Sequence, residues 1–475
     1  MNETEDRKRQ RARDEAPRHA GRALVLVPLI RERKAEEGAP DRDAAARVEE
    51  AAGLARAIDL EVVDAVGVPL ASYRPATLFG AGKVADLGAT IAHDEVGLVI
   101  VDHALTPVQQ RNLEKAWKAK VIDRTGLILE IFGERAQTRE GRLQVELAHL
   151  TYQKSRLVRS WTHLERQRGG FGFLGGPGET QIEADRRVIS DRIDKIKKEI
   201  GTVVTRRRLQ RRSRKRSGYP VVALVGYTNA GKSTLFNALT RSGVFADDRL
   251  FATLDPTLRR VDLPNGTGMI LSDTVGFVSD LPTTLVAAFR ATLEEVAEAD
   301  LILHVRDISH PDTESQARDV AAVLHDLEID VNDPARVIEV WNKIDQIPLD
   351  ERPPRFVLPR AATGRSEASP LVVSVAALTG EGLPDLLHAI EERVAESAIL
   401  FRVELSGEGV AALHRLYEFG EVLSREDRED GSVAALVRVP AETVGRFDAA
   451  FPRSRRETRA PGAQRAPAGA GASPG

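Results

Sequence analysis

One stretch of the sequence constrains the fold of this 475-residue chain more than any other. It reads Gly226-Tyr227-Thr228-Asn229-Ala230-Gly231-Lys232-Ser233. This fits the Gly-x4-Gly-Lys-Ser/Thr spacing of a phosphate-binding loop. A β-branched run precedes it and apolar residues at helical spacing follow it, so strand, loop and helix come in the order that such a loop requires. We therefore expect a parallel α/β sheet that binds a nucleotide at this loop.

The residue types in this loop each have a chemical role. Gly226 and Gly231 permit backbone angles that turn successive N–H groups toward phosphate oxygens. Lys232 is predicted to reach the β- and γ-phosphates and to act in catalysis, and the hydroxyl of Ser233 is predicted to bind Mg²⁺. We count Thr234, which follows directly, among the nucleotide-binding residues.

A second motif indicates which base is bound. Asn342-Lys343-Ile344-Asp345 follows the apolar run 337–341, which places it at the carboxyl end of a strand, where open α/β sheets bind ligands. The Asp345 carboxylate can accept hydrogen bonds from both N1–H and the exocyclic amino group of guanine. Adenine offers no such pair of donors, so ATP would leave this carboxylate unpaired. The motif therefore predicts GTP and GDP as ligands.

A third motif lies between these two in the sequence. Asp273-Thr274-Val275-Gly276 follows a short apolar run at 269–271. We expect Asp273 to hold the Mg²⁺ ion through water, and the N–H group of Gly276 to sense the γ-phosphate and to act in catalysis. Thr274 and Val275 complete the predicted nucleotide contacts of this segment. The motif predicts a switch that follows the state of the nucleotide.

Together, the three motifs resemble the first, third and fourth motifs of a translation-factor-type GTPase domain. The resemblance implies a second motif, a threonine in a mobile segment between the first and the third. Thr253 and Thr257 are both candidates, and their spacing does not separate them. We favour Thr253 as the catalytic and Mg²⁺-binding threonine. The neighbouring residues that we count as nucleotide-binding are Phe251, Ala252, Leu254 and Asp255.

Two positions depart from the usual GTPase pattern. The fifth motif usually reads Ser-Ala-x-x-Gly, but Ala376 and Ala377 stand at its first two positions here. Since backbone N–H groups make the main contact with guanine O6 at this loop, the missing hydroxyl is expected to loosen base recognition without abolishing it. Ras-like enzymes place a water-orienting glutamine after the switch glycine, and this chain has Phe277. We therefore predict slow hydrolysis that accelerates when a partner orders the switch.

Two helices joined by a glycine-rich tip are expected ahead of the phosphate loop. Residues 169–178 contain six glycines and one proline, which interrupt any helix. Apolar residues then recur at helical spacing over 182–203, and a basic run without acidic residues follows at 206–216. Phosphate backbone is the commonest polyanion that neutralises such a run. The predicted RNA contacts are Arg206, Arg207, Arg208, Arg211 and Arg212.

Three further stretches narrow the resemblance to one family. The chain resembles the HflX group of ribosome-associated GTPases at residues 175–181 (GGPGETQ), 185–187 (DRR) and 251–257 (FATLDPT). The similarity covers about residues 22–397. It implies a family-specific N-terminal domain, a helical linker, a GTPase domain, and docking on the rRNA of the large ribosomal subunit with splitting of stalled ribosomes. The sequence does not separate ribosome rescue from subunit maturation or storage of idle ribosomes.

Composition and hydropathy complete the predicted organisation. The fold class is α/β. The predicted segments begin with a disordered arm at 1–21, a small α/β domain at 22–150 and a helical-hairpin linker at 151–217. A P-loop GTPase domain with a mostly parallel sheet and helices on both faces follows at 218–398. The last segments are a small α+β domain at 399–452, which has a helix at 410–423, and a disordered tail at 453–475. No apolar stretch approaches the roughly 20 residues that cross a bilayer, and there are no cysteines. We expect a cytoplasmic monomer that binds no DNA.

Two functions of different classes compete. The leading hypothesis is a Mg²⁺-dependent GTP hydrolase whose nucleotide state gates attachment of the helical hairpin and the N-terminal domain to a ribonucleoprotein. The alternative is an RNA-binding or remodelling module in which GTP is mainly structural and the basic run supplies the affinity. A membrane-associated signalling GTPase would need an exposed amphipathic basic helix or a lipidation motif, and neither is evident.

Overall fold

The computed structural model describes residues 21–30, 43–167, 177–216, 219–241, 250–266, 268–279, 290–357, 370–396, 398–428, 430–440 and 443–457. The chain divides into two compact units, residues 1–208 with 221–387, and residues 209–220 with 388–475. Most of the predicted arm, most of the predicted tail and residues 168–176 of the predicted tip lie outside the described residues.

The first unit begins with a four-stranded parallel sheet in the order β2-β1-β3-β4. Its strands are β1 (Arg22–Ile30), β2 (Glu61–Leu70), β3 (Leu98–Val101) and β4 (Lys120–Asp123). The alternating helices are α2 (Ala44–Arg56), α3 (Ala81–His93), α4 (Pro107–Trp117) and α5 (Arg124–Arg135). Successive residues of β1 belong to two different hydrophobic clusters, one on each face of the sheet. A parallel sheet buried on both faces confirms the predicted small α/β domain.

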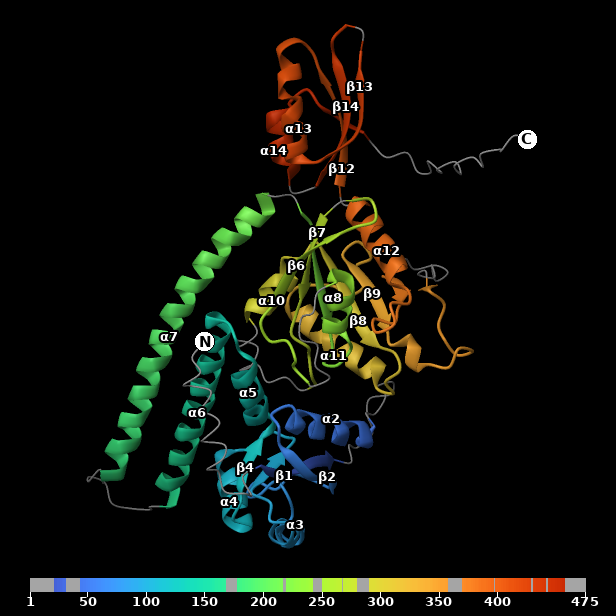
Figure 1. Ribbon diagram of the computed structural model, residues 1–475. Coiled ribbons are helices and arrows are strands. Elements are labelled where there is room, and N and C mark those ends of the chain that lie inside the picture. The colour runs from blue at the N-terminus through green and yellow to red at the C-terminus, as the bar shows by residue number, and fades with distance from the viewer. Residues whose placement is uncertain are drawn as a thin grey trace, which may run out of the picture. The chain divides into compact units, whose positions relative to one another are not determined.

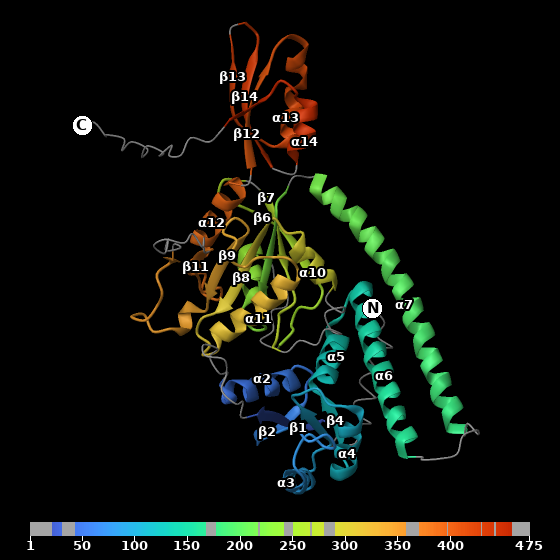
Figure 2. The same cartoon turned by 180° about the vertical axis from the view of Figure 1, so that it is seen from behind.

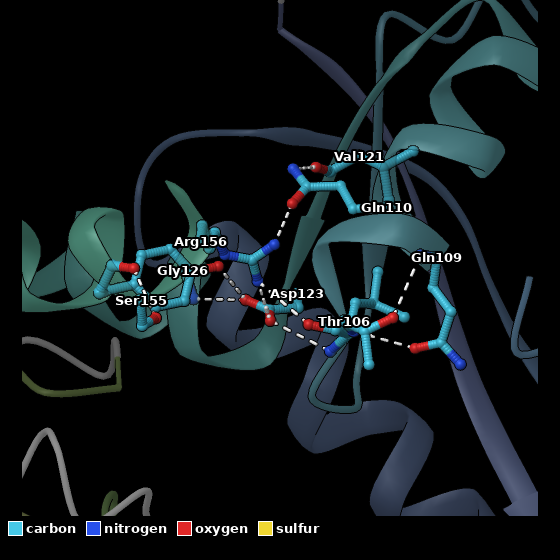
Figure 3. Close-up of polar contacts among 10 residues, drawn as sticks. Thr106, Gln109, Gln110, Val121, Asp123, Gly126, Ser155 and Arg156 are labelled. Carbon is cyan, nitrogen blue, oxygen red and sulfur yellow. Dashed lines mark hydrogen bonds and ion pairs between the residues drawn. The ribbon is translucent and has the colours of Figure 1, made fainter. Parts of the chain in front are cut away.

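The last strand of this sheet ends at Asp123, whose buried carboxylate ties several elements together (Figure 3). It caps the start of α5 by accepting a hydrogen bond from the Gly126 N–H group (2.8 Å) and accepts another from Leu105 N–H (3.1 Å). The Tyr152 hydroxyl donates to it (2.6 Å), and the Arg156 guanidinium pairs with it (2.5 Å). These partners offset the cost of burying the charge, so we assign Asp123 a structural role.

Two long helices form a helical arm, which belongs to the first unit up to residue 208. They are α6 (Arg139–Gln167) and α7 (Pro177–Arg216). Both views show them side by side (Figures 1 and 2), and ion pairs join Arg192 to Glu146 (2.7 Å) and Arg139 to Glu199 (3.6 Å). The pairing order shows that they run in opposite directions, as in the predicted helical hairpin, but α6 begins at Arg139, before the predicted linker start at 151. Of the helices in the described residues, none is long and apolar enough to span a membrane.

A seven-stranded sheet follows in the order β10-β11-β9-β8-β5-β7-β6. Its strands are β5 (Val221–Gly226), β6 (Thr257–Asp262), β7 (Gly268–Asp273), β8 (Leu301–Asp307), β9 (Val337–Asn342), β10 (Phe356–Val357) and β11 (Leu371–Ser374). Only the edge pairs, β6 with β7 and β10 with β11, are antiparallel within the described sheet. The helices that accompany it are α8 (Lys232–Thr240), α10 (Arg290–Ala297), α11 (Thr313–Asp326), α12 (Leu383–Glu396) and the 3-10 turn η2 (Ile344–Gln346). This confirms the predicted mostly parallel sheet (Figures 1 and 2).

The second unit contains an antiparallel sheet in the order β13-β14-β12-β15. Its elements are β12 (Ala398–Leu405), η3 (Gly407–Ala412), α13 (Leu413–Phe419), β13 (Glu421–Asp427), β14 (Val433–Pro440), α14 (Val444–Ala450) and β15 (Arg455–Glu457). The helix predicted at 410–423 is shorter than expected, because Gly420 ends it and residues 421–423 join a strand. The predicted tail begins too early, since β15 pairs with β12 and Arg456 forms an ion pair with Asp448.

Candidate functional site

The phosphate loop connects β5 to α8 near the middle of the seven-stranded sheet. Gly231 has a φ of 88°, and a Cβ atom at this position would overlap the side-chain amide of Asn342. Both the backbone angle and the space therefore require glycine. The Asn342 Nδ2 atom donates to the Ala230 carbonyl (2.8 Å), and its Oδ1 atom accepts from Ala377 N–H (3.0 Å). Asn342 thus joins the first, fourth and fifth motifs, and its side chain shapes the loop.

Lys232 lies buried at the start of α8. Its ammonium group donates to the carbonyls of Gly226 (3.1 Å) and Tyr227 (2.7 Å). Burial lowers the pKa of Lys232 to about 8, although the nearby charge of Asp273 acts in the opposite direction. Removing an ammonium group from water favours its neutral form unless an anion compensates. A bound phosphate would provide that compensation.

We expect nucleotide binding to take up protons above about pH 8. A free-protein pKa of about 8 leaves much of Lys232 neutral at higher pH, whereas a bound phosphate would raise that pKa and restore the proton. Uptake should be small near pH 7 and approach one proton near pH 9, so apparent GDP affinity should fall as the pH rises. Calorimetry in buffers of different ionisation enthalpy measures this, and uptake that does not grow with pH would contradict the expectation.

Three oxygen-bearing side chains from three segments meet beside Lys232. The hydroxyls of Ser233 (2.7 Å) and Thr253 (3.0 Å) both donate to Asp273 Oδ2, and the two hydroxyl oxygens are 2.9 Å apart. Burial raises the pKa of Asp273 against the lowering effect of these hydrogen bonds. Within the described ranges, Asp273 Oδ1 is buried and has no hydrogen-bond partner. Two hydroxyls and a carboxylate with an unpartnered oxygen are hard ligands that fit Mg²⁺.

The structure separates the two candidate threonines. Thr253 contacts Ser233 and Asp273, as described above, whereas Thr257 begins β6 and pairs with Asp273 along the backbone ladder. The nucleotide contacts of the neighbours of Thr253 stay a prediction. Phe251 and Leu254 are buried in a hydrophobic cluster, and the Asp255 carboxylate is bound to residues 137 and 138. The side chains of Phe251 and Asp255 face the N-terminal half of the first unit, because their partners, Phe132 and residues 137 and 138, lie there.

The third motif lies against the phosphate loop. A Cβ atom on Gly276 would lie 2.8 Å from Thr228 Cα and 3.0 Å from Lys232 Nζ, so only glycine permits this approach. The nucleotide contacts of Thr274 and Val275 stay a prediction. The Thr274 hydroxyl donates to a β5 carbonyl, and Val275 is buried in the core. Gly276 is the residue of this motif that reaches the loop.

The predicted base-binding residues lie after β9 and after β11. The Asp345 side chain is half-buried in η2, and no hydrogen bond to its carboxylate occurs within the part of the chain that the structure describes. Lys343 forms an ion pair with Asp307 (2.7 Å). The Ala376 N–H group donates to the Glu381 carbonyl (2.9 Å), and that of Ala377 is held by Asn342. The contact of these two N–H groups with guanine stays a prediction.

One network at this site was missed by sequence reasoning. The hydroxyl of Tyr227, in the phosphate loop, donates to Glu50 on α2 (2.5 Å) and accepts from Ser279 N–H (2.8 Å), two residues beyond Phe277. The Arg124 guanidinium lies 2.6 Å from Glu50 and 2.9 Å from the Ser279 carbonyl. Burial would raise the pKa of Glu50, but the Arg124 charge and the hydrogen bonds lower it. Periodicity shows that α2 has a buried face, yet nothing in the pattern identifies its partner.

One predicted RNA-contact residue is engaged within the protein. The Arg207 guanidinium lies 2.9 Å from Glu295 on α10 and 3.4 Å from Glu140 on α6, and its side chain is only 14% exposed. This differs from the predicted RNA contact, because two carboxylates distant in the sequence already neutralise the charge. The side chains of Arg206, Arg208, Arg211 and Arg212 lie outside the described part of the chain.

Comparisons with known proteins agree with this geometry. Family models match residues 45–133 (GTP-binding GTPase N-terminal), 135–214 (GTP-binding GTPase Middle Region), 221–343 (50S ribosome-binding GTPase) and 361–456 (HflX C-terminal domain).

Relatives extend the match over most of the chain. GTPase HflX of Magnetococcus marinus is 48% identical over 427 residues, which cover 90% of this chain and 94% of that protein. GTPase HflX of Escherichia coli K12 is 44% identical over 366 residues, which cover 77% and 83%. A solved GTP-binding protein of Sulfolobus solfataricus in complex with GDP is 22% identical, with a TM-score of 0.43 and coverage of 78% and 98%, a likeness too low to support an argument. From the relatives and the family models, the chain belongs to the GTPase HflX family and is a GTP hydrolase.

Proposed function

We propose that this GTP hydrolase binds the large ribosomal subunit in a nucleotide-dependent manner and acts in splitting or rescuing ribosomes. The observation that carries the proposal is the meeting of Ser233, Thr253 and Asp273 beside Lys232. These residues come from three different segments, so a ligand that binds all three fixes their relative positions. The family model described as a 50S ribosome-binding GTPase covers the same residues and supports the partner.

Mg²⁺ is the proposed cofactor. Ser233 and Thr253 would hold the ion directly, and the buried Asp273 carboxylate would hold it through water. The ion would neutralise charge on the β- and γ-phosphate oxygens when bound. Lys232 binds the same phosphates, and the Gly276 N–H group, which lies against the loop, reports the presence of the γ-phosphate. Loss of that phosphate would free both switch segments.

Hydrolysis by the isolated protein should be slow. Phe277 stands where a water-orienting side chain would be, and it is buried, with its N–H and carbonyl groups hydrogen-bonded to the phosphate loop. An apolar ring cannot orient the attacking water. Large subunits are therefore proposed to stimulate turnover by ordering the switch segments.

We expect purified large subunits to bind the protein with a GTP analogue more tightly than with GDP, and to raise GTP turnover by roughly tenfold or more. Co-sedimentation over a salt series, together with phosphate release at saturating GTP, measures both effects. Thr253→Ala is the matched variant, since it should bind subunits equally with either nucleotide. Light scattering of intact ribosomes then tests splitting.

The same experiment tests the alternative function as an RNA-binding or remodelling module. The basic end of α7 favours that alternative, although Arg207 is already paired with carboxylates. Binding that weakens with salt but ignores the nucleotide, combined with unchanged turnover, would support the RNA-binding module and refute the nucleotide-gated function.

A further inference from the structure

The segment that carries Thr253 is anchored on both sides to residues far earlier in the chain. On one side, the Phe251 ring packs edge-on against Phe132 of α5, with 4.9 Å between ring centroids. On the other side, the Asp255 carboxylate accepts hydrogen bonds from the N–H groups of Gln137 (2.9 Å) and Thr138 (2.8 Å) and from the Thr138 hydroxyl. Both anchors join the Thr253 segment to the N-terminal part of the first unit.

The second anchor sits at the beginning of α6. The Thr138 hydroxyl accepts a hydrogen bond from Gly141 N–H (3.0 Å), as the capping residue of a helix does, while it donates its own proton to Asp255. Free N–H groups and the positive end of the helix dipole both favour a carboxylate at this position. A Cβ atom on Gly141 would overlap the Asp255 carboxylate, so the helix leaves room for it.

Thr253 lies two residues from each anchor, and two residues span at most about 7 Å. Its hydroxyl can meet Ser233 and Asp273 only if the segment between the anchors is held in place. A ligand position must be correct to within about 0.5 Å to be effective. The anchors therefore determine how precisely the Thr253 hydroxyl is positioned in the proposed metal site.

The other nucleotide-sensing segments contact the same part of the chain. Tyr227 of the phosphate loop and Ser279 beyond the third motif are bound to Glu50 and Arg124. The phosphate loop, the threonine segment and the third-motif segment therefore all rest on residues from the first 138 positions. Of these contacts, the two anchors of the Thr253 segment lie closest in sequence to a proposed metal ligand, and the Asp255 cap is the polar one.

We propose that Asp255 is a positioning residue for GTP hydrolysis, which holds Thr253 in the metal site by capping the start of α6. This inference rests on the proposed metal-binding role of Thr253. Because the cap lies at the beginning of α6, the first turn of this helix is coupled to the nucleotide state. An ordered Thr253 favours the cap, and the cap favours an ordered Thr253. The coupling is reciprocal, as linkage requires.

Three substitutions break the cap from different sides. Asp255→Ala removes the acceptor, Thr138→Ala removes one donor, and Gly141→Ala displaces the carboxylate while favouring the helix itself. Each should lower kcat by about 10- to 100-fold, as misplaced catalytic groups do. Each should also raise the Mg²⁺ concentration needed for half-maximal turnover. GDP affinity should stay within about twofold, because Thr253 is released in the diphosphate state.

Two further variants separate positioning from folding. Asp255→Asn should recover most of kcat, because the amide oxygen can still accept from the Gln137 and Thr138 N–H groups while the amide nitrogen donates to the Thr138 hydroxyl. Gly133→Ala, also inside a helix but with nothing near its added Cβ atom, should match the wild type. Thermal melting of each variant identifies any that does not fold, in which case the Asp255→Ala and Asp255→Asn pair still decides the question.

Thr253→Ala separates this inference from the proposed function. Wild-type kcat and Mg²⁺ dependence in Thr253→Ala would refute the proposed metal role of that residue. The positioning role alone would be overturned if Thr253→Ala reduced kcat while folded Asp255→Ala and Gly141→Ala kept wild-type kcat and Mg²⁺ dependence. Reduced kcat and altered Mg²⁺ dependence in all three would support both.

Discussion

Lys232→Ala is expected to cause a large loss of affinity for GTP and a smaller loss of affinity for GDP. The Lys232 ammonium is held by two loop carbonyls at the point where the β- and γ-phosphates are predicted to lie. A hydrogen bond to a charged group contributes about 1.5–3 kcal/mol. Losing contacts to two phosphates would weaken GTP binding by roughly 10²- to 10⁴-fold. GDP lacks the γ-phosphate, so losing the one β-phosphate contact would weaken GDP binding by roughly 10- to 100-fold. Equilibrium binding of a fluorescent GDP analogue, or calorimetry, measures the change.

The chain provides its own control for this substitution. Lys83 also follows a glycine near the start of a helix, α3, but it is exposed and no full phosphate-loop spacing surrounds it. Lys83→Ala should bind GDP as the wild type does. Comparable losses in both variants would mean that the effect comes from net charge, and GDP affinity retained in Lys232→Ala would show that the phosphate site lies elsewhere.

Asp345→Asn is expected to move base preference from guanine to xanthine. The asparagine amide would point a donor at the guanine amino group, whereas the xanthine carbonyl at that position can accept from it. We expect GTP affinity to fall by at least about 100-fold and XTP to become the better substrate. Competition between GTP and XTP for binding, followed by turnover of each, measures the preference.

Asp350→Asn is the matched control, because it makes the same chemical change at an exposed position a few residues away. It should leave the preference for GTP unchanged. If Asp345→Asn also retained that preference, the loop after β9 would not be the guanine site, although the phosphate site would be unaffected.

Local patterns were sufficient to predict the parts of the site that are close in sequence. The loop, its strand and its helix were predictable because a β-branched run, glycines and helical spacing succeed one another without a gap. The placement of the Asp273 and Asn342 motifs at strand ends was predictable for the same reason. Parallel strands bring their carboxyl ends to one edge of a sheet, so these residues had to lie near each other.

The features that could not be predicted are contacts between distant segments. Tyr227 and Glu50 are 177 residues apart, and Asp255 and Thr138 are 117 residues apart. Charge alone predicted an RNA contact for Arg207, but Glu140 and Glu295 neutralise it from two other helices. The helix expected at 410–423 shows that tertiary pairing can override periodicity, because Val422 forms a strand pair with Val437.

The Asp255 cap has a consequence for how the chain is made. Synthesis proceeds from the N-terminus at about 5–20 residues per second, so Asp255 is added roughly 6 to 23 seconds after Thr138. Until then, the first turn of α6 lacks its carboxylate and must rely on water. The start of α6 therefore reaches its final form only after the Asp255 segment of the GTPase domain has emerged.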